Sequence, residues 1–477
     1  MWGGHISRLL LPRRFNSRGS QECRATIAVA HPPFSTVLLD NWLAQRALTC
    51  PDRAALITPG GSLTYAELEA EASAAARRLA ARGVRRGSDV AVELPAGLDH
   101  VVLIHALMKI GAVVHPLDRG LPGAEREAAL ERARPTLVVS APEDTSGPEA
   151  DLPLLGEHDL GAIHCHIRTS GTSGSARAVA LTYGNHLWSA VGSAFKLGVD
   201  PEDRWLCCLP LHHVSGLSIL MRSVIYGTGA VVHNGFDVDR VAESLSRDRV
   251  TVVSLVPTML VRLLDAGADL AGPRAILLGG GPVPLEVIEE AAGRGANVVQ
   301  TYGLTEAASQ VTTLETREAP LKLGSAGRPL LTTHLRIQAG EILVQGPTVA
   351  PGCADEDGWL HTGDLGTIDE EGFLYVRDRL DDVIVTGGEN VVPSEVEEVL
   401  LRHPHVADAA AVPRPDPEWQ QAVTAVVVLR RGAQASADDL RRHCAGSLAG
   451  HKVPKRVEFA AELPRTPSGK LLRRALR

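Results

Sequence analysis

The chain has 477 residues, enough for about two to four domains and a large hydrophobic core. Its 44% hydrophobic and 22% charged residues are typical of a globular protein and exclude collagen, coiled-coil and disordered chains. The net charge of −8 and the lack of a long apolar run predict no nucleic-acid partner and no membrane insertion. Seven cysteines without a C-x-x-C pair fit a reducing cytoplasm better than a disulfide framework.

Residues 1–35 differ from the rest of the chain, because several arginines stand against a single acid, Glu22. A transit peptide has this character, but no apolar stretch followed by a cleavage site suggests secretion. We favour a disordered extension or a start codon assigned too far upstream. The folded part is expected to begin near Leu38.

From there the sequence alternates between helix and strand patterns. A capping box, Thr64-x-x-Glu67, precedes an amphipathic helix that ends at Gly83. Other helices are predicted over Glu125–Arg134 and Leu285–Ala292. Strands are predicted at Asp89–Leu94, Thr136–Ser140, Val250–Leu255 and Ala275–Leu278. This alternation favours a mostly parallel α/β sheet, and the short strands with Gly and Pro turns over 322–378 favour a small β subdomain.

After Arg379 a compact tail of α+β type is predicted. Its strands are Val406–Val412 and Ala422–Leu429, and its helices are one capped by Ser394-x-x-Glu397 and one over Ala437–Leu448. The predicted organisation is an extension at 1–35, a large domain at 36–379 and a small domain at 380–477.

The segment from Thr169 to Arg177 is the most informative stretch. It combines hydroxyl side chains, two glycines and one cation. Glycines let backbone N–H groups turn toward an anion, and hydroxyls and a cation add to the binding of a polyphosphate. No Gly-Lys-Ser/Thr ends the segment, so it is not a Walker A loop. A flexible Ser/Gly loop is the alternative for this segment alone.

The segment resembles the nucleotide-binding loop of the adenylate-forming superfamily, with Ala176, Arg177 and Ala178 in place of the usual Pro, Lys and Gly. More motifs that resemble this superfamily follow in its order. They are Leu209–Gly216, Leu278–Pro284, Tyr302–Glu306, Trp359–Asp364, Arg379–Asp382 with Gly387–Asn390, and Pro464–Lys470. The resemblance implies a large N-terminal domain of α/β sheets plus a small β subdomain, and a smaller mobile α+β C-terminal domain.

The resemblance also implies a reaction, in which ATP and a carboxylate give an acyl-adenylate that is then passed to a thiol. ATP, Mg²⁺ and CoA are the implied cofactors and cosubstrates. The implied catalytic residues are Lys470, Glu306 and His213, with Glu306 and Thr172 at the metal. Asp381 is the implied hinge, and Gly388 lies on the implied path of the thiol. The implied ATP-binding residues are Thr169, Ser170, Gly171, Thr172, Ser173, Gly174, Arg177, Gly280, Gly281, Tyr302, Gly303, Thr305, Asp364 and Arg379.

Within the superfamily, the stretch from Asp203 to Gly227 looks like the o-succinylbenzoate–CoA ligases of menaquinone synthesis. Their acid has a second carboxylate, for which the candidate ligands are Arg222, Ser215 and the Ser309–Thr312 region after the Glu306 motif. Alternatives are another acyl- or aryl-CoA synthetase, an enzyme that loads a carrier protein, and a non-catalytic nucleotide-binding protein. A homo-oligomer is compatible with all of them.

Two clusters resemble soft metal sites at first sight. Cys207-Cys208 with His212-His213 and the run His164-Cys165-His166 hold suitable ligands, but neither has the spacing of a zinc site. A buried strand that leads into the His213 motif explains the first cluster better.

Overall fold

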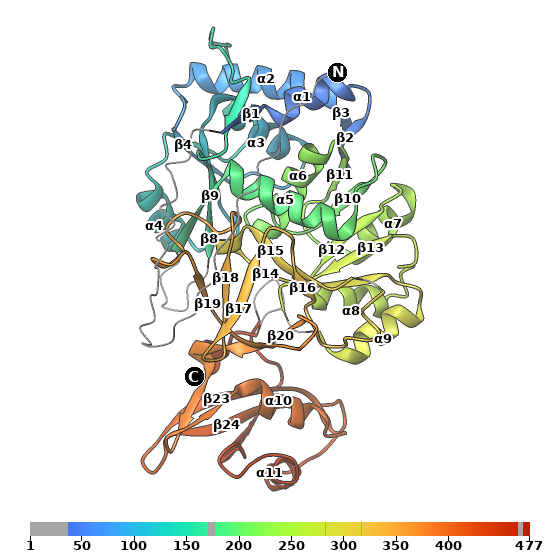
Figure 1. The fold of residues 1–477 in the computed structure, drawn as a ribbon, viewed down its shortest axis with the longest axis vertical. Coiled ribbons are helices and arrows are strands. Elements are labelled where there is room, and N and C mark those ends of the chain that lie inside the picture. The colour runs from blue at the N-terminus through green and yellow to red at the C-terminus, as the bar shows by residue number, and fades with distance from the viewer. Residues whose placement is uncertain (1–36, 170–176, 282, 316, 466–470) are drawn as a thin grey trace, which may run out of the picture. The chain divides into compact units, whose positions relative to one another are not determined.

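The computed structural model describes residues 37–169, 177–281, 283–315, 317–465 and 471–477. Val37–Arg477 forms one compact unit (Figure 1). Its first described strand, β1 (Leu38–Asp40), pairs antiparallel with β7 (Glu157–Asp159). Among the described residues, no helix combines the length and the apolar character that a membrane span requires.

A five-stranded sheet carries the predicted phosphate loop, in the order β6-β4-β5-β8-β9. The first four strands are parallel and β9 is antiparallel to β8. The two strands predicted over Asp89–Leu94 and Thr136–Ser140 are confirmed as β4 and β6. The bounds are β4 (Asp89–Val92), β5 (Val113–Pro116), β6 (Leu137–Val139), β8 (Ile163–Thr169) and β9 (Arg177–Thr182).

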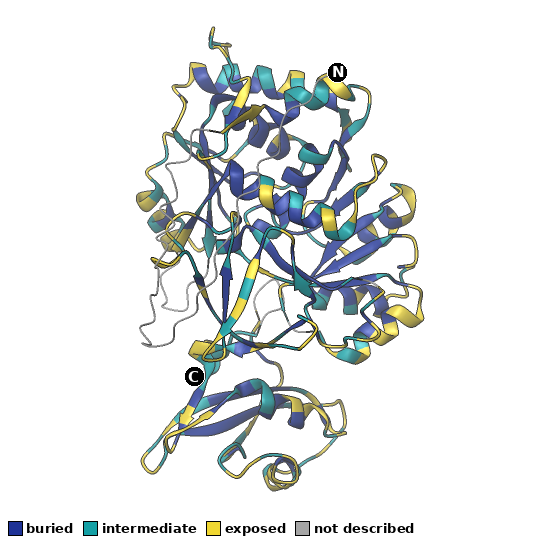
Figure 2. Cartoon of the chain, in the orientation of Figure 1, coloured by how far each residue is buried: buried dark blue, intermediate teal, exposed yellow. Residues whose placement is uncertain are grey.

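A nine-stranded sheet forms the second layer, in the order β16-β15-β14-β13-β12-β10-β11-β2-β3. Its central strands are parallel and buried, as the apolar runs predict, and Figure 2 shows both large sheets as the dark interior. The bounds are β2 (Ala54–Thr58), β3 (Gly61–Thr64), β10 (Arg204–Cys207), β11 (Gly229–Val232), β12 (Val252–Leu255), β13 (Ala275–Leu278), β14 (Val298–Leu304), β15 (Ser309–Thr313) and β16 (Arg328–Pro329).

Helices connect the strands of the two sheets. The capping box at Thr64 and Glu67 is confirmed, and a second one joins Thr182 to Asn185 at the start of α5. The bounds are α1 (Trp42–Thr49), α2 (Tyr65–Ala81), α3 (Leu98–Ile110), α4 (Gly123–Ala133), α5 (Tyr183–Leu197), α6 (Val214–Tyr226), α7 (Val238–Arg247), α8 (Pro257–Asp265) and α9 (Leu285–Gly293), with the 3₁₀ turns η1 (Pro142–Thr145) and η2 (Thr305–Ala307).

The small β subdomain is a four-stranded antiparallel sheet in the order β17-β18-β19-β20. After it come a two-stranded hairpin and an α+β unit whose three strands are ordered β23-β24-β25. The bounds are β17 (His334–Gln338), β18 (Glu341–Gln345), β19 (Leu360–Ile368), β20 (Leu374–Arg379), η3 (Leu380–Asp382), β21 (Ile384–Thr386), β22 (Glu389–Val391), α10 (Pro393–Leu401), β23 (Val406–Asp416), β24 (Gln420–Leu429), α11 (Ala437–Ala445), β25 (Arg456–Phe459) and η4 (Arg473–Leu476).

The predicted cap at Ser394 and Glu397 is wrong. The helix α10 begins at Pro393, and its N-cap is Val392, two residues before Ser394, without a side-chain hydrogen bond. Proline suits that position because it has no N–H to satisfy. Glu397 instead turns its carboxylate to the N–H of Ala411, at 2.8 Å, and to a buried arginine described below.

Four buried histidines, which we term the buried imidazole group, lie between α3, β7, β8 and α5. The rings of His164 and His186 are hydrogen-bonded, Nδ1 to Nε2, at 3.0 Å. Burial lowers the pKa of His105 and His186 to about 3, lowers that of His158 to about 4, and holds that of His164 well below its usual range. All four rings are therefore neutral at pH 7. The group is His105, His158, His164 and His186.

Candidate active site

The predicted phosphate loop joins β8 to β9. Thr169 pairs with Arg177 in the antiparallel register, and the Thr169 hydroxyl donates to the carbonyl of Arg177 at 3.3 Å. These two residues thus hold the two ends of the loop together. β9, which begins at Arg177, contacts η2, which carries Glu306, so the loop end lies near the Glu306 motif. The loop residues Ser170, Gly171, Thr172, Ser173 and Gly174 lie outside the described residues.

The motif from Tyr302 to Glu306 forms the turn of a hairpin between β14 and β15. A register shift separates Tyr302 from Gly303, where a β-carbon would lie 1.7 Å from the carbonyl oxygen of Ser309. Only glycine therefore fits, because a side chain would collide with the backbone. Ala308 and Ser309 have φ angles of 52° and 96°, which are unusual for residues with a side chain.

Glu306 lies on η2 in this turn and is half-buried, and Thr305 precedes it. The backbone N–H of Ala350 donates to the Glu306 carbonyl at 2.8 Å, which fixes the turn against the next segment. Among the described residues, none forms a hydrogen bond or ion pair with the Glu306 carboxylate. With no partner in the described part of the chain, this carboxylate has the hard oxygen ligands that Mg²⁺ prefers, which suits the predicted metal role.

A three-residue cluster joins the nine-stranded sheet to the small β subdomain at this point. Asp364 on β19 is buried and accepts from the Tyr302 hydroxyl at 2.7 Å and from Arg379 Nη1 at 2.8 Å. Asp364 and Arg379 are direct register partners on β19 and β20. Burial and the neighbouring carboxylate hold the pKa of Tyr302 well above its usual range, so the phenol stays a donor. Asp364 keeps lone pairs for two further donors such as ribose hydroxyls.

The glycine turn after β13 lies at the same sheet edge. Gly280 has a φ of 83°, and Gly281 follows it. Because β13 and β14 are parallel, the turn and the Tyr302 motif both lie beyond the carboxyl ends of neighbouring strands. Open α/β sheets bind ligands at that edge.

His213 occupies the N-cap of α6, without a side-chain cap bond. Partial burial lowers the pKa of His213, and the neighbouring His212, whose ring centroid lies 4.4 Å away, lowers it further. The residue still keeps exposed surface. Its imidazole is neutral at pH 7. Ser215 is in the first turn of the same helix and its carbonyl accepts from Ser218 at 3.1 Å. The Ser218 hydroxyl lies 3.5 Å from that of Ser309, which places this end of α6 beside the Glu306 hairpin.

Arg222 is 2% exposed, so it is not a surface arginine. Its Nη2 donates to Ser189 at 3.1 Å, its guanidinium lies 5.4 Å from the centre of the Trp205 ring, and its buried Nε has no partner among the described residues. No carboxylate of the described chain pairs with it. Ser189 in turn donates to the carbonyl of Ala308 at 2.7 Å, which links the buried cation to the Glu306 hairpin. The sequence carried no signal for Ser189.

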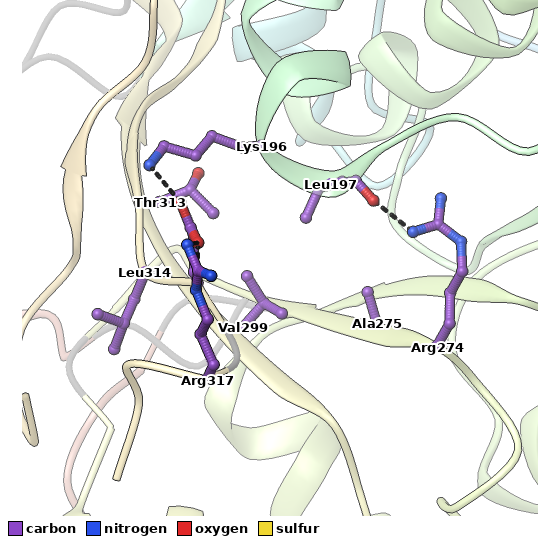
Figure 3. A pocket seen from close by; sticks show the side chains of 9 residues that line it. Lys196, Leu197, Arg274, Ala275, Val299, Thr313, Leu314 and Arg317 are labelled. Atoms are coloured by element: carbon purple, nitrogen blue, oxygen red, sulfur yellow. Dashed lines mark hydrogen bonds and ion pairs between the residues drawn. The ribbon is translucent and has the colours of Figure 1, made fainter. Parts of the chain in front are cut away.

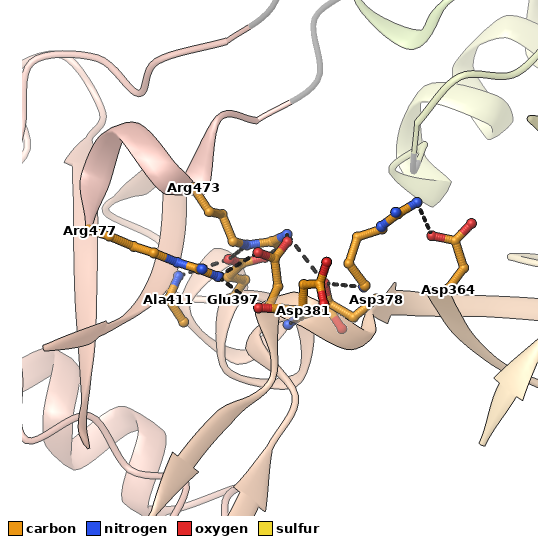
Figure 4. Close-up of polar contacts among 10 residues, drawn as sticks. Asp364, Asp378, Asp381, Glu397, Ala411, Arg473 and Arg477 are labelled. Atoms are coloured by element: carbon orange, nitrogen blue, oxygen red, sulfur yellow. Dashed lines mark hydrogen bonds and ion pairs between the residues drawn. The ribbon is translucent and has the colours of Figure 1, made fainter. Parts of the chain in front are cut away.

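The predicted hinge residue Asp381 lies in η3, and Gly388 lies in the turn between β21 and β22 with a φ of 83°. The last residues of the chain contact this region (Figure 4). Arg477 donates to the Asp381 carbonyl at 3.2 Å and to Asp382 at 2.6 Å. Lys470 lies outside the described residues, so its predicted place beside the α-phosphate stays a prediction.

A separate pocket of about 270 Å³ lies at the other end of β14, near Val299 (Figure 3). Its three cations are already paired with acids: Lys196 and Arg317 with Glu315, at 3.1 and 2.9 Å, and Arg274 with Asp203 at 2.6 Å. It contains none of the predicted site residues. Tyr302, Gly303, Thr305 and Glu306 lie instead toward the opposite end of the strand.

Comparison with known proteins agrees with this arrangement. The model of the AMP-binding enzyme family matches residues 43–166 and 155–353, and that of the AMP-binding enzyme C-terminal domain matches residues 395–470. The chain is 40% identical over 474 residues to a 2-succinylbenzoate–CoA ligase of Bacillus cereus, covering 92% of this chain and 98% of that protein. A Bacillus cytotoxicus protein of the same name is 39% identical over the same shares.

Solved structures give the same picture. The o-succinylbenzoate CoA synthetase of Bacillus subtilis in complex with its acyl-adenylate intermediate has a TM-score of 0.86 at 39% identity, with 92% of this chain and 98% of that chain covered. Its complex with ATP and magnesium has the same TM-score at 38% identity, covering 92% and 100%. With family models over most of its length and a close relative over 92%, the chain belongs to the AMP-binding enzyme family.

Proposed function

We propose that this protein is an o-succinylbenzoate–CoA ligase, which makes o-succinylbenzoyl-CoA for menaquinone synthesis from the free acid, ATP and CoA. The observation that carries the proposal is the likeness to 2-succinylbenzoate–CoA ligases over almost the whole chain. The site geometry supports it, since the cluster of Tyr302, Asp364 and Arg379 adjoins the Glu306 hairpin. Arg222, a buried cation without a carboxylate partner among the described residues, is linked to that hairpin through Ser189.

The reaction has two steps. A carboxylate oxygen of the acid attacks the α-phosphorus of ATP and pyrophosphate leaves, which converts a poor leaving group into AMP. The CoA sulfur then attacks the acyl carbon, the thiol proton goes to solvent and AMP leaves. Because the first step brings two anions together, its catalysis is mainly positioning and charge neutralisation.

We assign the charge-neutralising roles as follows. Thr169 and the hydroxyls and glycines at 170–174 bind the β- and γ-phosphates, with Arg177 supplying a cation. Glu306 and Thr172 would hold Mg²⁺, which when bound would neutralise the polyphosphate. Lys470 approaches the α-phosphate, where negative charge accumulates in the first step.

The remaining ATP contacts follow from the cluster described above. Asp364 accepts from the ribose hydroxyls, and Tyr302 and Arg379 hold its carboxylate in place. Gly280, Gly281, Gly303 and Thr305 shape the nucleotide pocket with their backbones, and neutral His213 borders the acid.

Arg222 and Ser215 are proposed to select the acid. One carboxylate of o-succinylbenzoate is activated, so the other needs a cation or hydrogen-bond donors. Arg222 is a buried cation that lacks a described carboxylate partner, and such a cation is strongly stabilised by an anion that enters its surroundings.

The first experiment measures AMP release and thioester formation by mass with ATP, Mg²⁺, CoA and a panel of acids. A strong preference for o-succinylbenzoate supports the proposal. Turnover of simple fatty or aryl acids instead keeps the mechanism and rejects the substrate. Acyl transfer only to a carrier-protein thiol rejects CoA as the acceptor, and no acid-dependent pyrophosphate exchange rejects the enzyme altogether.

The second experiment separates acid from nucleotide binding. Arg222→Ala should raise the KM for o-succinylbenzoate much more than the KM for ATP. Arg336→Ala serves as the control, because that arginine lies on Trp359 in the small β subdomain. Equal effects on both KM values would remove Arg222 from the acid site.

We also propose that residues 380–477 form a separate domain that turns about Asp381 between the two steps, bringing Gly388 toward the thiol. Residues 1–35 are proposed to be an extension that precedes the domain at 36–379.

The protein is expected in the cytoplasm. Its substrates are small molecules. A homo-oligomer is compatible with this function.

A further inference from the structure

A group of three metal-ligand side chains lies on the five-stranded sheet, outside the residues assigned to the reaction. Asp89 begins β4, His115 lies in β5 and His166 lies in β8, and these strands are neighbours in the sheet. His115 pairs with Ala91, two residues after Asp89, so both side chains are on the same face. Val114 pairs with Cys165, which places His115 and His166 side by side.

The geometry of the three side chains is compact. His115 Nε2 is 2.6 Å from Asp89 Oδ1, and the rings of His115 and His166 stack with centroids 4.6 Å apart. One ligand atom from each of the three residues lies within 4.8 Å of the others. The Asp89 side chain is 36% exposed, so solvent reaches the group. No hydrogen bond to another described residue engages the His166 ring.

Two imidazole nitrogens and one carboxylate oxygen form a donor set suited to borderline divalent metals such as Zn²⁺ and Co²⁺. Metal–ligand bonds of about 2.0–2.2 Å place neighbouring ligand atoms roughly 3.0–3.5 Å apart. His115 and Asp89, at 2.6 Å, would therefore move apart slightly, and the widest pair, within 4.8 Å, would move closer. Side-chain rotation supplies both changes, because the three residues lie on adjacent strands. Mg²⁺ prefers oxygen ligands and is not expected to bind here.

We propose that Asp89, His115 and His166 bind one divalent transition metal ion, with water completing its coordination. The ion would tie β4, β5 and β8 together. Because β8 ends at Thr169, it would brace the strand that leads into the phosphate loop. This site is independent of the proposed substrate.

The neighbouring trio of His164, Cys165 and His186 is a poorer candidate, although its ligand atoms are equally close. All three residues are fully buried or nearly so, whereas the Asp89 side chain of the proposed site is 36% exposed to solvent. Burial raises the pKa of the Cys165 thiol, which opposes the thiolate that a metal needs. This trio is part of the core, and it supplies the alternative that the experiment must distinguish.

The test titrates the purified full chain, without ATP, with Co²⁺ and Zn²⁺. Visible absorption reports the Co²⁺ ligands, and thermal unfolding reports stabilisation. We expect one equivalent of Co²⁺ to give d–d bands typical of nitrogen and oxygen ligands. Zn²⁺ should raise the unfolding temperature by about 2 °C or more at a hundredfold excess over Kd, because it binds the folded state selectively.

The variants Asp89→Asn and His166→Gln should each weaken Co²⁺ binding at least tenfold. His334→Gln, which removes an exposed imidazole from β17, should leave it unchanged. Two variants keep the test valid if one of them folds poorly. Binding that persists in both variants would overturn the proposal, as would an intense thiolate-to-cobalt charge-transfer band, which would place the metal at Cys165.

Discussion

Arg473, near the end of the chain, offers the sharpest test of the energetics. Its side chain is 16% exposed and meets three carboxylates (Figure 4). Nη2 and Nε donate to Glu397 at 2.7 and 3.0 Å, and Nη1 lies 3.3 Å from Asp378 and 3.2 Å from Asp382. The arginine thus ties η4 to α10 and to the end of β20 and η3.

The substitution Arg473→Ala should cost about 3 kcal/mol of unfolding free energy. Removing one partner of a buried ion pair typically costs about 3–5 kcal/mol, because the other charge stays buried without compensation. The lower end applies here, since the side chain keeps some contact with water. Arg402→Ala, at the C-cap of α10, is the matched control: its ion pair with Glu398 is exposed on both sides and should be worth less than about 1 kcal/mol.

The loss should also depend on pH. Burial raises the pKa of Glu397, while Arg473 opposes that rise, so the variant should raise the pKa further. A carboxyl whose folded pKa lies above its unfolded pKa contributes stability below the unfolded pKa and loses it as pH rises through the folded pKa. The deficit of Arg473→Ala relative to the natural chain should therefore be larger at pH 8 than at pH 5.

Urea unfolding, with hydrogen exchange resolved to residues 380–477, measures both effects. The double variant Arg473→Ala with Glu397→Gln should recover part of the loss, because it removes the uncompensated charge. A loss below 1 kcal/mol, or a loss that is the same at pH 5 and pH 8, would refute the view that Arg473 compensates a buried carboxylate.

Three further predictions follow from the site and the core. Asp364→Asn should raise the KM for ATP about 10- to 100-fold with little change in the KM for the acid, because the ribose hydroxyls lose hydrogen bonds to a charged acceptor. Pyrophosphate exchange measures both KM values, and an unchanged KM for ATP would contradict the prediction. Gly303→Ala should abolish exchange by displacing the Glu306 hairpin, whereas Gly123→Ala, where nothing lies within 4 Å, should be harmless in the same assay. The buried imidazole group should make the fold acid-sensitive, because the unfolded chain takes up protons below pH 6.5 and the folded chain only near pH 4 or lower. The free energy of unfolding should therefore fall as pH drops through this window, by up to about 1.4 kcal/mol per histidine and pH unit. Urea unfolding measures this, and equal midpoints at pH 7 and 5 would disprove it.

The sequence predicted local structure well where one short-range rule decides it. The strand at Ala275–Leu278 and the cap at Thr64 are confirmed because an apolar run and a capping box act over a few residues. The predicted cap at Ser394 fails because the Ser-x-x-Glu pattern takes no account of the neighbouring residues or of tertiary contacts. Pro393 starts the helix two residues earlier than a cap at Ser394 would, and Glu397 finds a tertiary partner, Arg473, which lies 76 residues away.

The motifs and their order were enough to identify the family, because phosphate binding and adenylation need particular residue types at fixed spacing. The sequence placed Tyr302, Asp364 and Arg379 in one site, but only the tertiary structure shows that the phenol and the guanidinium hold the two oxygens of one carboxylate. It also shows that Arg222 is buried behind Ser189. Contacts of this kind join side chains from different sheets and helices, and their partners are selected by packing in three dimensions, which no local pattern records.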